Sequence, residues 1–176
     1  RSANWSAYTI HVAGGSYLDL NDSWDSARAA WMVNNTDPTN SLITVGWNSQ
    51  NVNNNGDDHI IYAWHSVPGF SKIGTYTSTG ASDGTFVYTG FKPAWVMARR
   101  TGTANWCIFD NARNSANPLN RELYADTDSA EDTSDDDIDF LSNGFKLRRA
   151  ATNFNDASTQ FYMAFAELPF SYARGR

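Results

Sequence analysis

The sequence predicts an all-β fold, an antiparallel β-sandwich of the lectin-like or jelly-roll-like kind, built from two related halves. Short segments rich in aromatic and β-branched residues recur along the chain, separated by Gly, Pro, Asn and Asp. Helical periodicity is weak, and turn residues come too often for long helices. Strands that recur without intervening helices favour a sandwich or a barrel.

Nine segments are expected to form strands, because each is short, apolar or aromatic, and bounded by turn residues. They are residues 5–12, 42–47, 60–64, 72–76, 85–88, 95–100, 106–109, 145–148 and 161–167. Three pairs, Asn55-Gly56, Asp83-Gly84 and Asn143-Gly144, are expected to form tight turns, since Gly adopts a positive φ at little steric cost.

The best candidate helix covers residues 23–33. Asp22 or Ser23 could cap it, and Trp24, Ala27, Ala30 and Trp31 follow at helical spacing. An irregular segment is the alternative, if these residues correspond to the loop at 114–122 of the other half.

An internal repeat relates the two halves. Residues 3–5 (Ala-Asn-Trp) recur at 104–106, and residues 63–68 align with 164–169, both with a displacement of 101 (104 − 3 and 164 − 63). A repeat of this length is a duplicated domain-sized unit. Because a duplicated module usually builds a surface, the repeat argues against a single catalytic constellation.

The repeat divides the chain into a partial first copy, residues 1–70, and a complete second copy, residues 71–176. The first copy begins after the position of one strand of the second. We therefore expect the chain to be the C-terminal part of a longer polypeptide, or the two copies to share strands in one continuous sandwich.

Most tryptophans are expected in the core, because packing tolerates another aromatic residue at an equivalent position. The equivalent pairs are Trp5 with Trp106, Trp47 with Phe145, and Trp64 with Phe165. Trp24 and Trp31 have no obvious counterpart. These two are the candidates for ligand contacts, with burial as the alternative.

Composition and charge exclude several classes of partner. A net charge of −6 argues against nucleic acid, whose backbone is bound by clustered Lys and Arg. No apolar run approaches the roughly twenty residues that span a bilayer, so membrane insertion is not expected. The single cysteine, Cys107, excludes a disulfide framework, and its apolar neighbours predict a buried small hydrophobe.

No catalytic residues are predicted, because the three histidines lack zinc spacing and no serine has a nucleophile-elbow sequence. Sugar binding fits the composition better, since aromatic rings stack on sugars and amides or carboxylates bind their hydroxyls. The candidate polar ligands are Asn53, Asn55 and Asp57, together with Trp24 and Trp31.

No cofactor is expected, although Ca²⁺ is possible at Asp126 and Asp128, whose carboxylates alternate along the chain. A hydrogen-bonded turn is the alternative there. The surrounding segment, residues 126–139, carries eight acidic side chains. Such a segment repels itself, so it must lie on a solvated loop or share cations.

Five segments occur in a fixed order in the second copy. They are Gly-Phe-x-Pro-x-Trp at 90–95, Trp-x-x-x-Asp-x-x-Arg at 106–113, an acidic stretch at 126–139, Asn-Gly-Phe at 143–145 and an aromatic strand at 162–170. This order resembles an uncharacterised repeat domain of tail-fibre and other structural proteins of tailed bacteriophages.

The resemblance implies a non-enzymatic virion protein, exposed on the particle surface as a fibre or appendage that attaches to a host-surface glycan. Its partners would be other virion proteins and that glycan, and analogy with such appendages suggests a homotrimer. One alternative is a capsid or tail decoration protein with purely structural contacts. Another is a glycan depolymerase domain, because paired carboxylates need no proximity in sequence.

Overall fold

The computed structural model describes residues 5–11, 17–23, 25–26, 33–34, 36–46 and 52–168. The chain forms two compact units, Arg1–Ala63 and Trp64–Arg176. Within the described part every regular element is a β-strand and all strand pairs are antiparallel, which confirms the all-β prediction. No helix in this part could cross a membrane.

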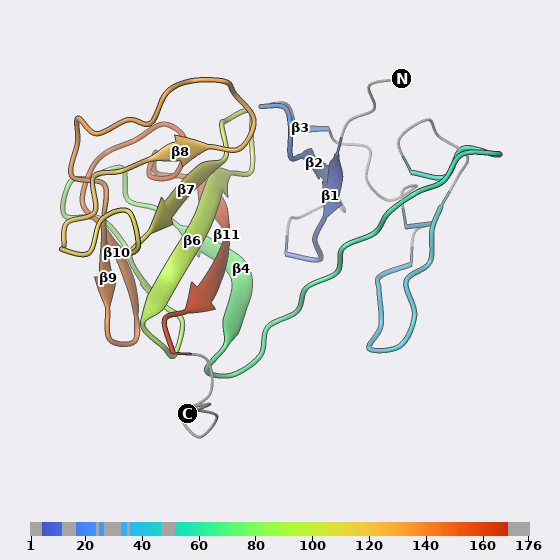
Figure 1. Ribbon diagram of the computed structural model, residues 1–176, viewed down its shortest axis with the longest axis horizontal. Coiled ribbons are helices and arrows are strands. Elements are labelled where there is room, and N and C mark those ends of the chain that lie inside the picture. Colours follow the sequence, from blue (N-terminus) through green and yellow to red (C-terminus); the bar gives the residue numbers. More distant parts are fainter. Residues whose placement is uncertain are drawn as a thin grey trace. The chain divides into compact units, whose positions relative to one another are not determined.

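The second unit is a two-layered antiparallel sandwich (Figure 1). One sheet has the strand order β4 (Ser71–Thr77), β11 (Thr159–Ala166), β6 (Pro93–Arg100), β7 (Cys107–Asp110) and β8 (Leu123–Tyr124). The other has the order β5 (Phe86–Tyr88), β10 (Gly144–Leu147) and β9 (Ile138–Leu141). Neighbours in the sheets are often far apart in sequence, because β11 pairs with both β4 and β6.

Aromatic side chains from both sheets fill the space between the layers. Phe145 of β10 meets Tyr76 of β4 and Tyr162 of β11 edge-on, with ring centroids 5.9 and 5.5 Å apart. Such edge contacts are favourable beyond the apolar area they bury. Burial of Trp106, Phe145 and Cys107 confirms the core prediction at these positions.

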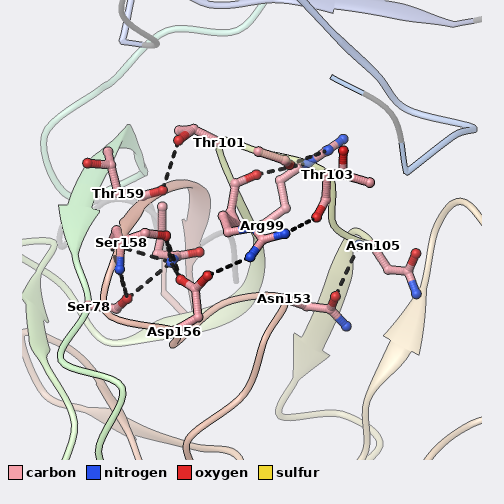
Figure 2. A network of polar contacts seen from close by, with 12 residues as sticks. Ser78, Arg99, Thr101, Thr103, Asn105, Asn153, Asp156, Ser158 and Thr159 are labelled. Carbon is pink, nitrogen blue, oxygen red and sulfur yellow. Dashed lines mark hydrogen bonds and ion pairs between the residues drawn. The ribbon is translucent and has the colours of Figure 1, made fainter. Parts of the chain in front are cut away.

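A polar network closes the end of the larger sheet where β4 and β6 end and β11 begins (Figure 2). Arg100 Nη1 lies 2.8 Å from Asp156 Oδ2, while Asp156 Oδ1 accepts bonds from Ser158 Oγ (2.5 Å) and Gln160 Nε2 (2.6 Å). Gln160 Nε2 also reaches Ser78 Oγ at 3.0 Å. Satisfying these buried polar groups fixes the loop between β10 and β11.

Hydroxyl groups close the outer edge of β4. Ser66 Oγ accepts from Ile73 N (3.0 Å) and donates to Ile73 O (3.3 Å), and Thr85 Oγ1 donates to Thr77 O (2.9 Å). Side-chain capping of backbone groups prevents another strand from pairing at these positions.

The first unit contains a three-stranded sheet with the order β1 (Ser6–Tyr8), β2 (Tyr17–Asp19) and β3 (Asp25–Ser26). Ala7 lies opposite Leu18, which in turn lies opposite Asp25. The pairing of Asp25 and Ser26 with β2 shows that the helix prediction for residues 23–33 is wrong at these two positions. Trp24 and residues 27–32 of that segment lie outside the described residues.

The sheet of the first unit reproduces the β7–β8 edge of the second. The Trp5 N–H donates to Asn21 Oδ1 (2.6 Å), and the Trp106 N–H donates to Asp126 Oδ1 (3.0 Å). Two backbone bonds also match: Leu20 N to Trp5 O (2.8 Å) and Ala125 N to Trp106 O (3.0 Å). The tryptophans are 101 positions apart (106 − 5) and the Asn–Asp pair 105 (126 − 21), so β1 and β2 correspond to β7 and β8.

Seven of the nine predicted strands are found, with shifts of one to a few residues at their ends. The two wrong predictions are residues 42–46 in the first unit and residues 60–64 at the boundary of the two units, which belong to no strand. Their apolar pattern suits a strand, but no described strand pairs with them. Strands β2, β3, β8 and β9 were not predicted. Trp5 and Trp64 are exposed, so their expected burial is wrong, and Trp47 lies outside the described residues.

The three predicted Gly turns have different causes. Gly56 has φ +88°, as expected for the Asn55-Gly56 turn. Gly84 and Gly144 have no positive φ, so a positive φ is not the reason for glycine at these two positions, and that part of the prediction is wrong. Instead, a Cβ at Gly84 would lie 2.8 Å from Leu147 Cβ, and a Cβ at Gly144 would overlap Val87 O. Both positions require Gly because another chain segment approaches closely.

Candidate functional site

The outer face of the smaller sheet in the second unit presents two exposed aromatic side chains. On β5, Val87 is buried in the core, whereas Phe86 and Tyr88 are 43% and 65% exposed. Because side chains alternate along a strand, these two rings lie on the same side of the sheet, away from the core. We call the side formed by Phe86, Tyr88 and their cross-strand neighbours the outer face.

Strand register sets the neighbours of each ring. Tyr88 lies opposite Gly144 on β10, and Phe86 lies opposite Lys146. A Cβ at Gly144 would come within 2.9 Å of Phe86 Cζ, so the Phe86 ring extends across Gly144. The absence of a side chain at Gly144 therefore lets an apolar ring lie close against the sheet, where a flat ligand can reach it.

Charged groups border the two rings. Lys146 Nζ lies 2.5 Å from Asp83 Oδ1, and Arg148 Nε lies 3.4 Å from Asp139 Oδ2. The hydrogen bond from Lys146, and then its positive charge, lower the pKa of Asp83. The outer face thus combines exposed ring faces with ionised donors and acceptors. This is the chemistry that sugar rings need, since their C–H faces stack on aromatic rings and their hydroxyls bind polar groups.

A second cluster includes the end of the acidic segment, where Arg149 is shared by two buried carboxylates. Arg149 Nε donates to Asp137 Oδ1 at 2.6 Å, and Nη2 donates to Glu122 Oε2 at 3.0 Å. Burial raises the pKa of Asp137 to about 7, assisted by the negative charge of Glu122. Burial also raises the pKa of Glu122, although Cys107 and Arg149 oppose the rise.

This cluster holds the acidic segment in place. Glu122 and Asp137 are both buried, so neither carboxylate is presented to a substrate as a glycosidase would require. Further along, Glu131 pairs with Arg113 (2.5 Å) and Arg121 (3.0 Å). The acidic segment is expected to lie on a solvated loop or to share cations, and both are found: residues 127–130 and 133–136 are exposed, and Glu131 shares two arginines.

The raised pKa of Asp137 predicts a pH dependence of stability. A carboxyl whose pKa is higher in the folded state stabilises the fold at low pH, and this stabilisation is lost as pH rises from about 4 through about 7. We expect Asp137→Asn to flatten the decline in the unfolding free energy across this range. The slope of the unfolding free energy against pH should change by less than about 1.4 kcal/mol per pH unit, the value for one full proton. It should be smaller because Glu122 and Asp137 titrate together and share the proton uptake. Urea unfolding at several pH values measures it, and an unchanged slope would contradict it.

The predicted ligand residues Asn53, Asn55 and Asp57 lie together in one exposed turn. Asn53 Nδ2 donates to Gly46 O (2.9 Å), and Asp57 Oδ2 accepts from the Asn54 amide (2.6 Å). Asn53 and Asp57 thus stabilise the turn itself, and the role of the three residues in ligand binding stays a prediction. Trp24 and Trp31 lie outside the described residues.

The calcium candidates Asp126 and Asp128 occupy the loop that follows β8. Asp126 Oδ1 binds the Trp106 N–H, which is the same bond that neutral Asn21 makes in the first unit. The side-chain amide of Asn21 accepts the equivalent bond without a negative charge. The hydrogen bond to the Trp106 N–H therefore accounts for an oxygen acceptor at position 126 without a metal ion. Across the described residues, no group of three or more His, Cys, Asp and Glu side chains could hold a metal ion.

Sequence reasoning missed Phe86, Tyr88 and Lys146. The signal was available, because residues 85–88 were expected to form a strand, and alternation about an apolar Val87 places residues 86 and 88 outside. The prediction instead favoured Trp24 and Trp31, because these tryptophans have no obvious counterpart in the other copy. Among the polar residues that border the outer face, Asp83 is predicted from the sequence only as part of the Asp83-Gly84 turn.

One family model matches this chain, over residues 1–169, and its description is Domain of unknown function (DUF7483). The match spans both structural units. No curated protein and no solved structure matches the chain.

Proposed function

The chain belongs to the family of domains of unknown function DUF7483, and we propose that this member is a non-enzymatic module of a tailed-bacteriophage virion that attaches to glycans on the host surface. The phage assignment comes from the resemblance of the motifs in residues 90–170 to tail-fibre repeat domains. The module would lie on the particle surface, in a fibre or comparable appendage. A homotrimer with other virion proteins as neighbours is part of the proposal.

One observation carries the proposal of glycan binding, namely the exposure of Phe86 and Tyr88 on a rigid sheet. Each ring is held by a strand whose central residue is buried, so the rings need little ordering when a ligand binds. Lys146 and Asp139 lie in register with Phe86 across β10 and β9, where they can bind sugar hydroxyls. Sugar rings fit such a face because they offer an apolar side and a polar edge.

A decoration protein with purely structural contacts is the second candidate. It is favoured by the exposed apolar side chains of the first unit, which include Ile60 and Ile61. A depolymerase is the third, although the close carboxylate pair Glu122 and Asp137 is buried against Arg149.

We expect the purified chain to bind a subset of bacterial surface polysaccharides on a glycan array, and Tyr88→Ala to weaken this binding at least about fivefold. Loss of one stacked ring removes about 1–3 kcal/mol, by analogy with stacking on other ring systems. Phe86→Ala should act in the same direction. Reducing-sugar release from the bound polysaccharide would instead favour the depolymerase.

Two controls separate the ring from the fold. Tyr88→Phe keeps the stacking surface and should retain most of the affinity. Trp64→Ala removes an exposed aromatic residue elsewhere in the same unit and should leave binding unchanged. Equal binding by Tyr88→Ala and the natural chain, or no binding to any glycan on the array, would reject this face as the glycan site.

A further inference from the structure

The two exposed rings of the outer face lie beside two different glycines. The Phe86 ring crosses to β10, because a Cβ at Gly144 would lie 2.9 Å from Phe86 Cζ and 3.0 Å from Phe86 Cε2. The Tyr88 ring runs along its own chain segment, because a Cβ at Gly90 would lie 3.6 Å from Tyr88 Oη and 3.8 Å from Tyr88 Cζ. The two rings therefore cover different parts of the face.

The strand that carries the rings sets their separation. Phe86 and Tyr88 are two positions apart on β5, which places their Cα atoms about 6.6 Å apart along the strand. The Phe86 ring reaches Gly144, which lies opposite Tyr88, whereas the Tyr88 ring continues toward Gly90. Both rings thus lean in the same direction along β5 and stay separate. Because a pyranose ring is about the size of one aromatic ring, the face presents two stacking positions in line.

The charged groups of the outer face lie beyond Phe86, on the side away from Tyr88. Lys146 lies opposite Phe86, and residues with higher numbers on β10 lie farther from Tyr88, because β10 runs antiparallel to β5. Lys146 binds Asp83, which precedes Phe86 by three positions (86 − 83). Arg148 follows at the same end. The stacking position at Phe86 therefore has ion-paired donors and acceptors beside it, whereas the position at Tyr88 has the phenol hydroxyl.

The line of stacking positions is open at both ends. The side chain of Asp83 is 84% exposed at one end, and Gly90 is exposed at the other. A bound glycan has room to continue past either end. This arrangement differs from a pocket that encloses a single small ligand, such as one terminal sugar.

We propose, on the basis of the glycan-binding function proposed above, that the outer face binds the interior of a linear glycan and holds two adjacent sugar residues, one on Phe86 and one on Tyr88. The glycan lies along β5. The sugar on Phe86 carries the more polar substituents, because Lys146 and Asp83 bind them beside the ring. The sugar on Tyr88 is held by stacking and by the phenol hydroxyl.

The dependence of affinity on glycan length tests this proposal. Partial acid hydrolysis of the polysaccharide bound most tightly on the array gives its mono-, di- and trisaccharides. An NMR titration of the full chain should show that the best disaccharide binds at least about fivefold more tightly than the best monosaccharide. This is the smallest gain expected from one more stacked ring, by analogy with base stacking. The trisaccharide should add a smaller gain, because its third sugar has no ring to stack on.

Two variants identify the second stacking position. Tyr88→Ala should lower the ratio of disaccharide affinity to monosaccharide affinity toward one. Tyr88→Phe keeps the ring and should keep the ratio of the natural chain. Equal affinities of the natural chain for the monosaccharide and the disaccharide, or a ratio that is unchanged in Tyr88→Ala, would overturn the proposal.

These outcomes separate this proposal from the glycan-binding function. Equal affinities for the monosaccharide and the disaccharide, both weakened by Phe86→Ala, would keep the outer face as a glycan site and reject the second stacking position. Binding of no glycan by the natural chain would reject the proposed function itself, and the two stacking positions with it.

Discussion

Replacing Arg149 by Met is expected to lower the free energy of unfolding by about 3–5 kcal/mol, because it leaves two buried carboxylates without their cation. Arg149 Nη2 lies 2.5 Å from Asp137 Oδ1 and 3.0 Å from Glu122 Oε2, and both carboxylates are buried. Met retains much of the aliphatic volume that packs near Phe154, whose ring centroid lies 5.6 Å from the guanidinium carbon. The expected loss is therefore electrostatic.

Equilibrium urea unfolding at pH 7.5 measures this loss, with Arg148→Met as the matched control. Arg148 is adjacent in sequence, but its ion pair with Asp139 is longer, at 3.4 Å, and its side chain is 40% exposed. Exposed pairs contribute at most about 1 kcal/mol, so the control should stay close to the natural chain. Similar losses in the two variants would contradict the assignment of Arg149 as the cation for the buried pair.

The difference in unfolding free energy between Arg149→Met and the natural chain should shrink as the pH is lowered toward 5. Without the arginine, Glu122 and Asp137 favour their neutral forms even more strongly, so protons stabilise this variant relative to the natural chain. A deficit that is constant from pH 7.5 to pH 5 would point to lost packing instead of unpaired charge.

Replacing Gly144 by Ala is expected to destabilise the second unit by about 3 kcal/mol, because the new methyl group would overlap Val87 O of the neighbouring strand. The backbone oxygen cannot rotate away, so β5 and β10 must separate where Gly144 lies opposite Tyr88. The outer face should be disturbed as well, since the Cβ would also lie 2.9 Å from Phe86 Cζ.

Thermal unfolding gives this measurement, and Gly74→Ala is the matched control. Gly74 is also a strand glycine, but its nearest neighbour would be Tyr162 Cε1 at 3.4 Å, an ordinary contact distance. A change below about 1 kcal/mol is expected there. Equal stability of Gly144→Ala and the natural chain would show that β5 and β10 do not approach as closely as described.

Sequence patterns predicted most strands of the second unit because alternation and turn residues agreed. Strand β9 was missed because Ile138 and Phe140, which face the core, follow a dense run of acidic residues. Strand β8 has only two residues, too few for a periodic signal. Residues 60–64, where the first unit ends and the second begins, have the pattern of a strand, but a strand also needs a partner.

The candidate site was less predictable than the fold. Exposure of Phe86 and Tyr88 follows from strand alternation, but the role of Gly144 depends on how closely two strands approach. The Glu122–Arg149 contact joins residues 27 positions apart and depends on the whole sandwich. Asp126 resembled a calcium ligand in sequence, and only the bond shared with Asn21 revealed its role at the tryptophan backbone.

The central claim is that the outer face of the smaller sheet binds glycans. An NMR titration of the isotope-labelled chain with the oligosaccharide unit of the polysaccharide bound most tightly on the array tests it most directly. We predict chemical-shift changes concentrated at residues 86, 88, 144 and 146, with saturation at one site. Saturable changes confined to other residues, such as the turn at 53–57, would contradict the claim.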